Sequence, residues 1–219
     1  MNKIIRRRQP QAVLPLADHP LLDRIFSARD IRNKQQLDRT LAAMLPPQQL
    51  SGTESAVELL ISALQQQQKI VIVGDFDADG ATSTALAVLA LRKLGFQQVD
   101  YLVPNRFEQG YGLSVEVAKI ALEKQVELLI TVDNGISSNE GVAFIKRHNV
   151  KVIITDHHLP PNELPKADAI INPNLVDCPF PSKSLAGVGV TFYLMLALRA
   201  ALRDRGLIAV QALPNFAEL

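Results

Sequence analysis

The chain has 219 residues, of which 47% are hydrophobic and 21% charged, and its formal net charge at pH 7 is +1. This length suffices for one substantial α/β domain with a smaller appendage. No apolar stretch approaches the roughly 18 residues that span a bilayer, and a single cysteine excludes an internal disulfide. We therefore expect a soluble, cytoplasmic protein without a membrane partner. The balanced charge leaves nucleic-acid binding open, because positive potential can be confined to one groove.

Residues 1–68 contain helix signals and no convincing strand, so we expect a helical N-terminal extension that caps the following domain. Ser51 and Glu54 have the spacing of a capping box, and an amphipathic apolar stripe follows them. Pro46 and Pro47 separate this helix from weaker helical segments around residues 21–45.

From residue 69 to the end, apolar runs alternate with helical patterns, which is typical of a parallel sheet with crossover helices. We predict strands near 69–74, 99–103, 128–132, 151–155 and 168–171, and helices near 81–94, 114–124, 138–148 and 187–204. Ser137 and Glu140 form a second capping-box pattern. The predicted fold is a doubly wound α/β domain with a mainly parallel five-stranded sheet, followed by an end that looks truncated.

Three aspartates follow the first predicted strand. Asp75, Asp77 and Asp79 alternate, so on extended backbone they would share one face and repel one another unless a cation were bound. The pattern also opens an EF-hand loop, but that loop's closing glutamate is replaced by Leu86. Plain helix-capping carboxylates would explain one aspartate but hardly three.

Two further strands also deliver polar residues at their carboxyl ends. Asp133 follows the third strand, with a simple Asp-Asn-Gly turn as the competing interpretation, and Asp156, His157 and His158 follow the fourth. Parallel strands bring these ends to one edge, where Mn²⁺ or Mg²⁺ would find suitable ligands. Asp133 is placed to bridge two ions, and Asp156 to fix a histidine tautomer. Adjacent histidines on extended backbone should point to opposite sides.

Two other segments fall near the same edge. Arg106 could clamp a phosphate and Tyr111 could stack on a base, although a surface arginine and a packing tyrosine are nearly as compatible with the sequence. The small residues of 184–189 suit either anion contact or close packing at the start of a helix, and these two interpretations stay open.

Five motifs, at 73–83, 104–113, 131–136, 155–158 and 184–189, together resemble the DHH phosphoesterase superfamily. The resemblance implies a phosphodiesterase with two Mn²⁺ or Mg²⁺ ions. The implied roles cover nearly all the residues above: Asp77, Asp79, Asp133 and His157 as metal ligands, His158 at the scissile phosphate with Asp75 and Asp156 in support, and Arg106, Tyr111, Asn134 and Gly135 at the substrate.

Within the superfamily, the chain is most similar to the amino-terminal part of single-strand-specific 5′→3′ DNA exonucleases of repair and recombination. Single-stranded DNA is then the expected partner, with a single-strand-binding protein and a helicase as further ones. A metal-ligand aspartate expected after Gly189 is missing, so we expect weak activity from these 219 residues alone. The alternatives are a small-substrate relative, such as an oligoribonuclease or cyclic-dinucleotide phosphodiesterase, and a catalytically silent DNA-binding scaffold.

Overall fold

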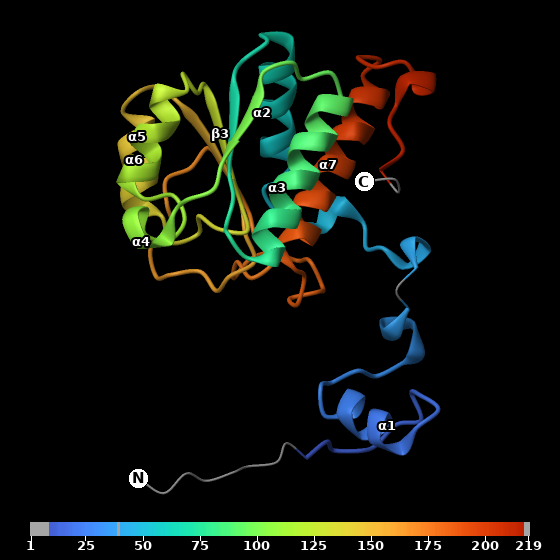
Figure 1. The fold of residues 1–219 in the computed structure, drawn as a ribbon. Helices are drawn as coiled ribbons and strands as arrows, with labels where there is room; N and C mark the ends of the chain where they lie inside the picture. The colour runs from blue at the N-terminus through green and yellow to red at the C-terminus, as the bar shows by residue number, and fades with distance from the viewer. Residues whose placement is uncertain (1–8, 39, 217–219) are drawn as a thin grey trace, which may run out of the picture. The chain divides into compact units, whose positions relative to one another are not determined.

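A computed structural model describes residues 9–38 and 40–216 and divides the chain into two compact units, Met1–Leu45 and Pro46–Leu219. The first unit contains helix α1 (Pro20–Ser27) and short 3-10 turns at Lys34–Leu37 and Leu41–Ala43 (Figure 1). The Asp23 carboxylate of α1 accepts hydrogen bonds from the backbone of Leu16 and Ala17 (2.8 and 2.6 Å), which ties the preceding segment to the helix.

The second unit is built on a five-stranded sheet in the order β2-β1-β3-β4-β5, and every neighbouring pair is parallel. Its strands are β1 (Ile70–Val73), β2 (Val99–Leu102), β3 (Leu128–Val132), β4 (Lys151–Thr155) and β5 (Ala169–Ile171). This topology confirms the predicted parallel α/β sheet. The three central strands are buried on both faces, which explains why they appear in the sequence as continuous apolar runs.

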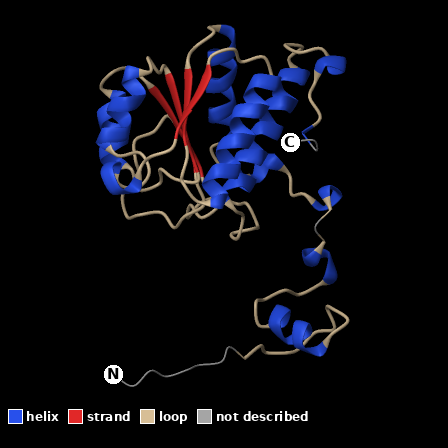
Figure 2. Cartoon of the chain, in the orientation of Figure 1, coloured by secondary structure: helices blue, strands red, loops and turns tan. Residues whose placement is uncertain are grey.

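Helices cover both faces of the sheet (Figures 1 and 2). Helices α5 (Val115–Glu123) and α6 (Asn139–Lys146) lie on one face, and α2 (Thr53–Gln65), α3 (Ala78–Lys93) and α7 (Gly187–Asp204) lie on the other. The short helix α4 (Arg106–Gln109) follows β2, and 3-10 turns occur at Pro47–Gln49 and Val210–Ala212. This two-sided covering is the arrangement expected from right-handed crossovers.

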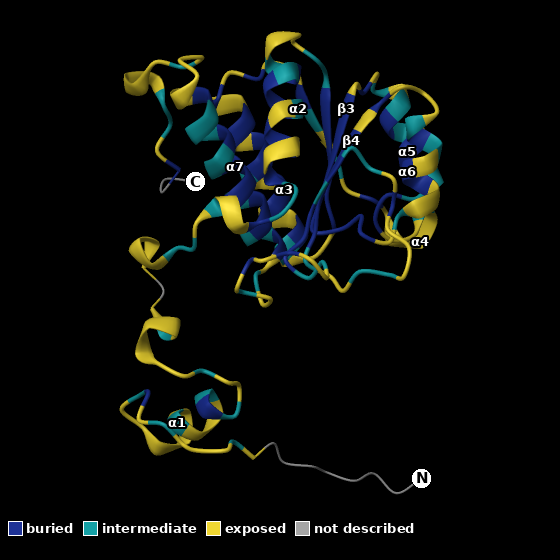
Figure 3. Cartoon of the chain, turned by 180° about the vertical axis from the view of Figure 1, so that it is seen from behind, coloured by how far each residue is buried: buried dark blue, intermediate teal, exposed yellow. Residues whose placement is uncertain are grey.

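One apolar core lies between the sheet and the pair α5 and α6. Because alternate strand residues point to the same face, Val71 and Val73 pack there together with residues of the two neighbouring strands. The main members are Val71, Val73, Leu129, Val152 and Ile154 from the sheet, and Val117, Ala121, Val142 and Ile145 from the helices. Buried residues run along the strands and the inner helix faces in Figure 3, so the carboxyl ends of the strands start from a rigid base.

Both predicted capping boxes are wrong. Helix α2 has Gly52 as its N-cap and α6 has Ser138, and the described residues give neither cap a side-chain hydrogen bond. Gly52 has a φ of +81°, and a Cβ there would lie 2.0 Å from the Ile170 carbonyl oxygen. Close approach to β5 therefore sets the start of α2, and the Ser51–Glu54 spacing does not.

The boundary between the two compact units lies earlier in the sequence than residue 68, where the sequence suggested that the helical extension ends. Helix α2 packs against α7 and β5 and thus belongs to the α/β unit. Among the described residues, no helix combines the length and the apolar character needed to cross a bilayer.

Candidate metal and phosphate site

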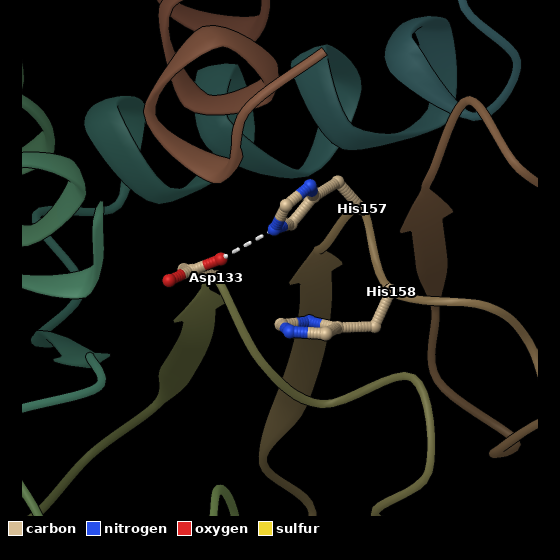
Figure 4. A group of neighbouring side chains, drawn as sticks. All are labelled: Asp133, His157 and His158. Atoms are coloured by element: carbon tan, nitrogen blue, oxygen red, sulfur yellow. Dashed lines mark ion pairs between the residues drawn. The ribbon is translucent and has the colours of Figure 1, made fainter. Parts of the chain in front are cut away.

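Acidic and imidazole side chains gather at the carboxyl edge of the three central strands. Two clusters each place one ligand atom per residue within 4.8 Å of the others: Asp75, Asp77 and Asp133 form the first, and Asp133, His157 and His158 form the second. Asp133 belongs to both, and Figure 4 shows it facing the two histidines. The predicted convergence of the strand ends is confirmed, and Asp133 lies at its centre.

Asp133 is held in an environment that disfavours its charge. Its side chain is 2% exposed, its φ is +60°, and its Oδ1 lies 3.1 Å from His157 Nε2. Among the described residues, that oxygen nevertheless has no partner with hydrogen-bond geometry. Burial and the nearby charges of Asp79 and Asp77 raise the pKa of Asp133 to about 7. A buried carboxylate without a donor is what a bound cation would neutralise.

The three aspartates after β1 do not share one face as predicted. Helix α3 begins at Ala78, three residues before the expected start, so Asp77 becomes its N-cap and accepts from the Gly80 N–H at 2.9 Å. Asp79 then lies in the first helical turn. A Cβ at Gly80 would lie 2.6 Å from the Asp75 Cβ, so this close return of the helix depends on glycine.

Asp79 faces helix α7. Its two oxygens accept hydrogen bonds from the backbone N–H groups of Gly187 and Val188, at 2.7 and 2.8 Å, and Oδ2 lies 3.6 Å from His157 Nε2. A Cβ at Gly187 would lie 2.3 Å from Asp133 Oδ1. The start of α7 therefore serves both purposes that the sequence left open, anion contact through the N–H groups of Gly187 and Val188 and close packing at Gly187.

His157 and His158 point toward the same carboxylate, so the prediction of opposite sides is wrong. Their ring centroids lie 4.7 Å apart, and both rings face the Asp133 region in Figure 4. The cause is Asp156, whose Oδ1 accepts from the backbone N–H groups of both histidines, at 2.7 and 3.1 Å. The backbone bends around the Asp156 carboxylate, whereas the prediction assumed that it stays extended through both histidines.

Asp156 also orients the His158 ring. Its Oδ1 lies 2.7 Å from His158 Nδ1, and its Oδ2 accepts from the Ile136 N–H at 2.9 Å. Burial lowers the pKa of His158, but the hydrogen bond and charge of Asp156 outweigh it and raise the pKa above its ordinary value. The hydrogen bond predicted for Asp156 is thus present, and it leaves Nε2 as the nitrogen directed away from this carboxylate.

A cavity of about 810 Å³ opens from this cluster toward the N-terminal ends of α5 and α6. Arg106, Tyr111 and Gly135 line it together with Asp75, Asp77, Asp156 and His158. The hydroxyl of Tyr111 donates to the Asp133 carbonyl at 3.4 Å, and burial followed by the surrounding carboxylates raises the Tyr111 pKa. Tyr111 is therefore a neutral hydrogen-bond donor at the cavity wall.

Asn134 does not face this cavity, although the sequence suggested substrate contact. Its side chain is fully buried, and its Nδ2 donates to the carbonyl groups of Val73 and Val132 at 3.0 and 2.9 Å. These bonds join the ends of β1 and β3. The neighbouring Gly135 does line the cavity, and its φ of +110° and its closeness to Thr131 require glycine.

Phe76 is the site residue that sequence reasoning missed. Its ring supports the Arg106 guanidinium, with Cζ 3.7 Å from the ring centroid. The sequence did contain a signal for this role: a large aromatic residue stands between two aspartates, shortly after a strand that is predicted to be buried.

A family model described as "DHH family, N-terminal domain" matches residues 69–217. Two curated relatives named single-stranded-DNA-specific exonuclease RecJ are 64% identical over 219 residues in Haemophilus influenzae and 58% identical over 219 residues in Escherichia coli. The alignments cover 100% and 98% of this chain, and the chain spans 38% of the length of each relative.

Solved structures agree with these matches. Exonuclease RecJ bound to manganese aligns with a TM-score of 0.64 at 37% identity, covering 70% of this chain and 39% of that one. RecJ from Thermus thermophilus in complex with Mn²⁺ gives a TM-score of 0.66 at 34% identity, over 84% of this chain and 25% of that one. The chain belongs to the DHH family and carries its N-terminal domain.

Proposed function

We propose that this chain is the amino-terminal catalytic part of a divalent-metal-dependent exonuclease that degrades single-stranded DNA with 5′→3′ polarity. The observation that carries the proposal is Asp133, whose buried Oδ1 has no hydrogen-bond donor among the described residues and which belongs to both clusters of potential ligands. If Asp133 served only to stabilise the fold, its carboxylate would be expected to have hydrogen-bond donors, because an unpaired buried carboxylate costs stability.

The residues fit a pair of hard divalent cations. Asp75, Asp77 and Asp133 offer carboxylate oxygens, and His157, which lies in the second cluster with Asp133, offers an imidazole nitrogen. Such oxygen-rich sets with few nitrogens suit Mn²⁺ and Mg²⁺. Asp79 would complete the set, although in this structure its oxygens bind the start of α7. When bound, the ions would supply Lewis-acid stabilisation of charge on the phosphate oxygens.

The chain's own groups have separable tasks around the scissile phosphate. His158, oriented through Nδ1 by Asp156, would present Nε2 as a donor to a phosphate oxygen. Arg106, which also lines the cavity, would pair with another phosphate of the strand. Tyr111 would close the wall beside the Asp133 carbonyl and offer a ring face to a nucleobase.

The names of the relatives support single-stranded DNA as the substrate. A cytoplasmic location, together with a single-strand-binding protein and a helicase as partners, belongs to the same proposal and awaits interaction and localisation experiments. Because the chain spans 38% of those relatives, we expect it to bind metal and short oligonucleotides but to degrade long strands weakly.

The decisive test compares wild type with Asp133→Asn in manganese titration calorimetry and in hydrolysis of 5′- and 3′-labelled single-stranded and duplex oligonucleotides. We expect Mn²⁺ binding and metal-dependent hydrolysis that favours single strands from the 5′ end, both lost in Asp133→Asn. Asp204→Asn, on the exposed end of α7, is the matched control. An unchanged Mn²⁺ isotherm in Asp133→Asn would refute the proposal and favour the silent scaffold, whereas faster turnover of dinucleotides would favour a small-substrate enzyme.

A further inference from the structure

The acidic motif contains one large aromatic side chain, and the fold leaves it half exposed. Phe76 lies between Asp75 and Asp77, and 50% of its surface is exposed although it closely follows the fully buried strand β1. A phenyl ring offers no ligand atom to a metal ion, and an exposed ring adds little to the core. The conformation of Phe76 therefore calls for another explanation.

The guanidinium of Arg106 lies over this ring. Its Cζ is 3.7 Å from the Phe76 centroid and 5.7 Å from the Tyr111 centroid, so both aromatic side chains are within reach of it and Phe76 is the closer. A guanidinium stacked on a ring is attracted to the π electrons, while its N–H groups still point outward in its own plane. Stacking thus supports Arg106 and leaves free the donors that a phosphate needs.

The other described contacts restrain Arg106 weakly. Its Nη2 lies 3.9 Å from Asp75 Oδ2, which is long for an ion pair, and its side chain is 52% exposed. It begins α4, a helix of four residues whose C-cap, Gly110, has a φ of +77°. A long side chain on so short an element would adopt many rotamers without a support, and ordering it on binding would weaken affinity.

We propose that Phe76 is a positioning residue that holds the Arg106 guanidinium against the acidic edge of the cavity, ready to receive a phosphate oxygen of the bound strand. The inference rests on the proposed phosphate contact of Arg106. It also gives the acidic motif a second purpose. The backbone N–H of Phe76 donates to Asp75 Oδ1 at 2.8 Å, so one turn fixes both a carboxylate of the cluster and the platform for the cation.

The test measures binding of 5′-phosphorylated, 3′-fluorescein-labelled tetrathymidylate to the 219-residue chain by fluorescence anisotropy, with Ca²⁺ replacing Mn²⁺ to prevent hydrolysis. We expect Phe76→Leu to weaken binding about tenfold, and Phe76→Tyr, which keeps a ring face, to retain wild-type affinity. Tyr101→Leu removes an aromatic side chain of similar exposure (52%) on β2 and should change nothing. Calorimetric Mn²⁺ affinity should stay within about twofold of wild type in all three variants, because the ring is not a ligand.

A double-mutant cycle shows whether Phe76 acts through Arg106. In an Arg106→Ala background, Phe76→Leu should cause no further loss, because the group that it positions is gone. Wild-type affinity in Phe76→Leu, or an equal loss of about tenfold in the Arg106→Ala background, would overturn the inference. The Arg106 δ-methylene proton resonances give a readout without ligand: Phe76→Leu should remove their upfield ring-current shift. If wild type binds neither Mn²⁺ nor the oligonucleotide, the proposed function fails, while a ring-current shift would still demonstrate the stacking.

Discussion

Replacing Asp133 by asparagine should stabilise the metal-free protein. In wild type, burial and the neighbouring aspartates raise the pKa of Asp133 from 3.8 to about 7. A carboxyl whose pKa is raised by folding holds its proton more tightly in the folded state, so its favourable contribution is complete below pH 3.8 and is lost as pH rises through about 7. Above that pH the folded protein carries a buried, unneutralised charge that asparagine avoids.

The magnitude follows from the size of the pKa shift. A shift of about 3 units at about 1.36 kcal/mol each sets an upper bound of about 4 kcal/mol on the gain at pH 8. Asparagine has nearly the same shape, so the packing against Gly187 is retained. With excess EDTA, urea unfolding at pH 8 should therefore show Asp133→Asn more stable than wild type, and the difference should shrink toward pH 4.

Divalent metal should narrow this difference. Mn²⁺ at about 100 times its dissociation constant stabilises a binding-competent protein by about 2.7 kcal/mol, and Asp133→Asn should gain much less. Asp204→Asn serves as control and should behave as wild type in both conditions, because Asp204 lies on the exposed end of α7. A destabilised Asp133→Asn in EDTA at pH 8, or a difference that does not change between pH 4 and pH 8, would refute the reasoning.

Three further predictions concern other residues of the fold. Gly187→Ala places a Cβ 2.3 Å from Asp133 Oδ1 and should weaken Mn²⁺ binding at least about tenfold with an unchanged far-ultraviolet circular dichroism spectrum; normal binding would show that α7 can move aside. Asp156→Asn should lower turnover of a 5′-phosphorylated oligonucleotide at least about tenfold by releasing the His158 ring, and a rate equal to wild type would contradict that role. Burial opposes the charge of Asp168, but two lysines and a backbone N–H outweigh it and lower its pKa. Asp168→Asn should therefore cost about 1–3 kcal/mol in urea unfolding at pH 7, and the wild-type advantage should decline as pH falls below 3.8 and through that lowered pKa; an advantage that stays constant below pH 3.8 would exclude this origin.

The sequence was sufficient to predict the sheet, because strands buried on both faces must be apolar throughout. The predicted runs at 69–74, 128–132 and 151–155 agree with β1, β3 and β4 to within a residue at each end. The same logic located the acidic edge, since parallel strands all end on one side. The fold and the gathering of Asp75, Asp77, Asp133 and His157 thus followed from periodicity and strand direction.

Details that depend on backbone curvature could not be predicted. The histidines were expected on opposite sides because strand alternation was extended one step too far, past the point where Asp156 bends the chain. Likewise, the capping boxes at Ser51 and Ser137 matched a spacing, while the N-caps are Gly52, where the chain packs closely against β5, and Ser138. Asp79 is predicted to be a metal ligand like its neighbours, because no feature of the nearby sequence shows that its hydrogen-bond partner is the start of a helix 108 residues away.

The charges of the site explain why a cation is needed even after the fold has offset part of them. Asp79 is offset by the N-terminus of α7, and Asp156 by three N–H groups and a ring nitrogen. Within the described part of the chain, Asp75 has one backbone N–H and a distant guanidinium, and the Asp133 Oδ1 has an imidazole without hydrogen-bond geometry. These two less compensated carboxylates, joined by Asp77, are the ones that form the first ligand cluster. The fold offsets the charges of Asp79 and Asp156 with its own N–H groups. It leaves Asp75 and Asp133 with less compensation, at the place where an ion would bind.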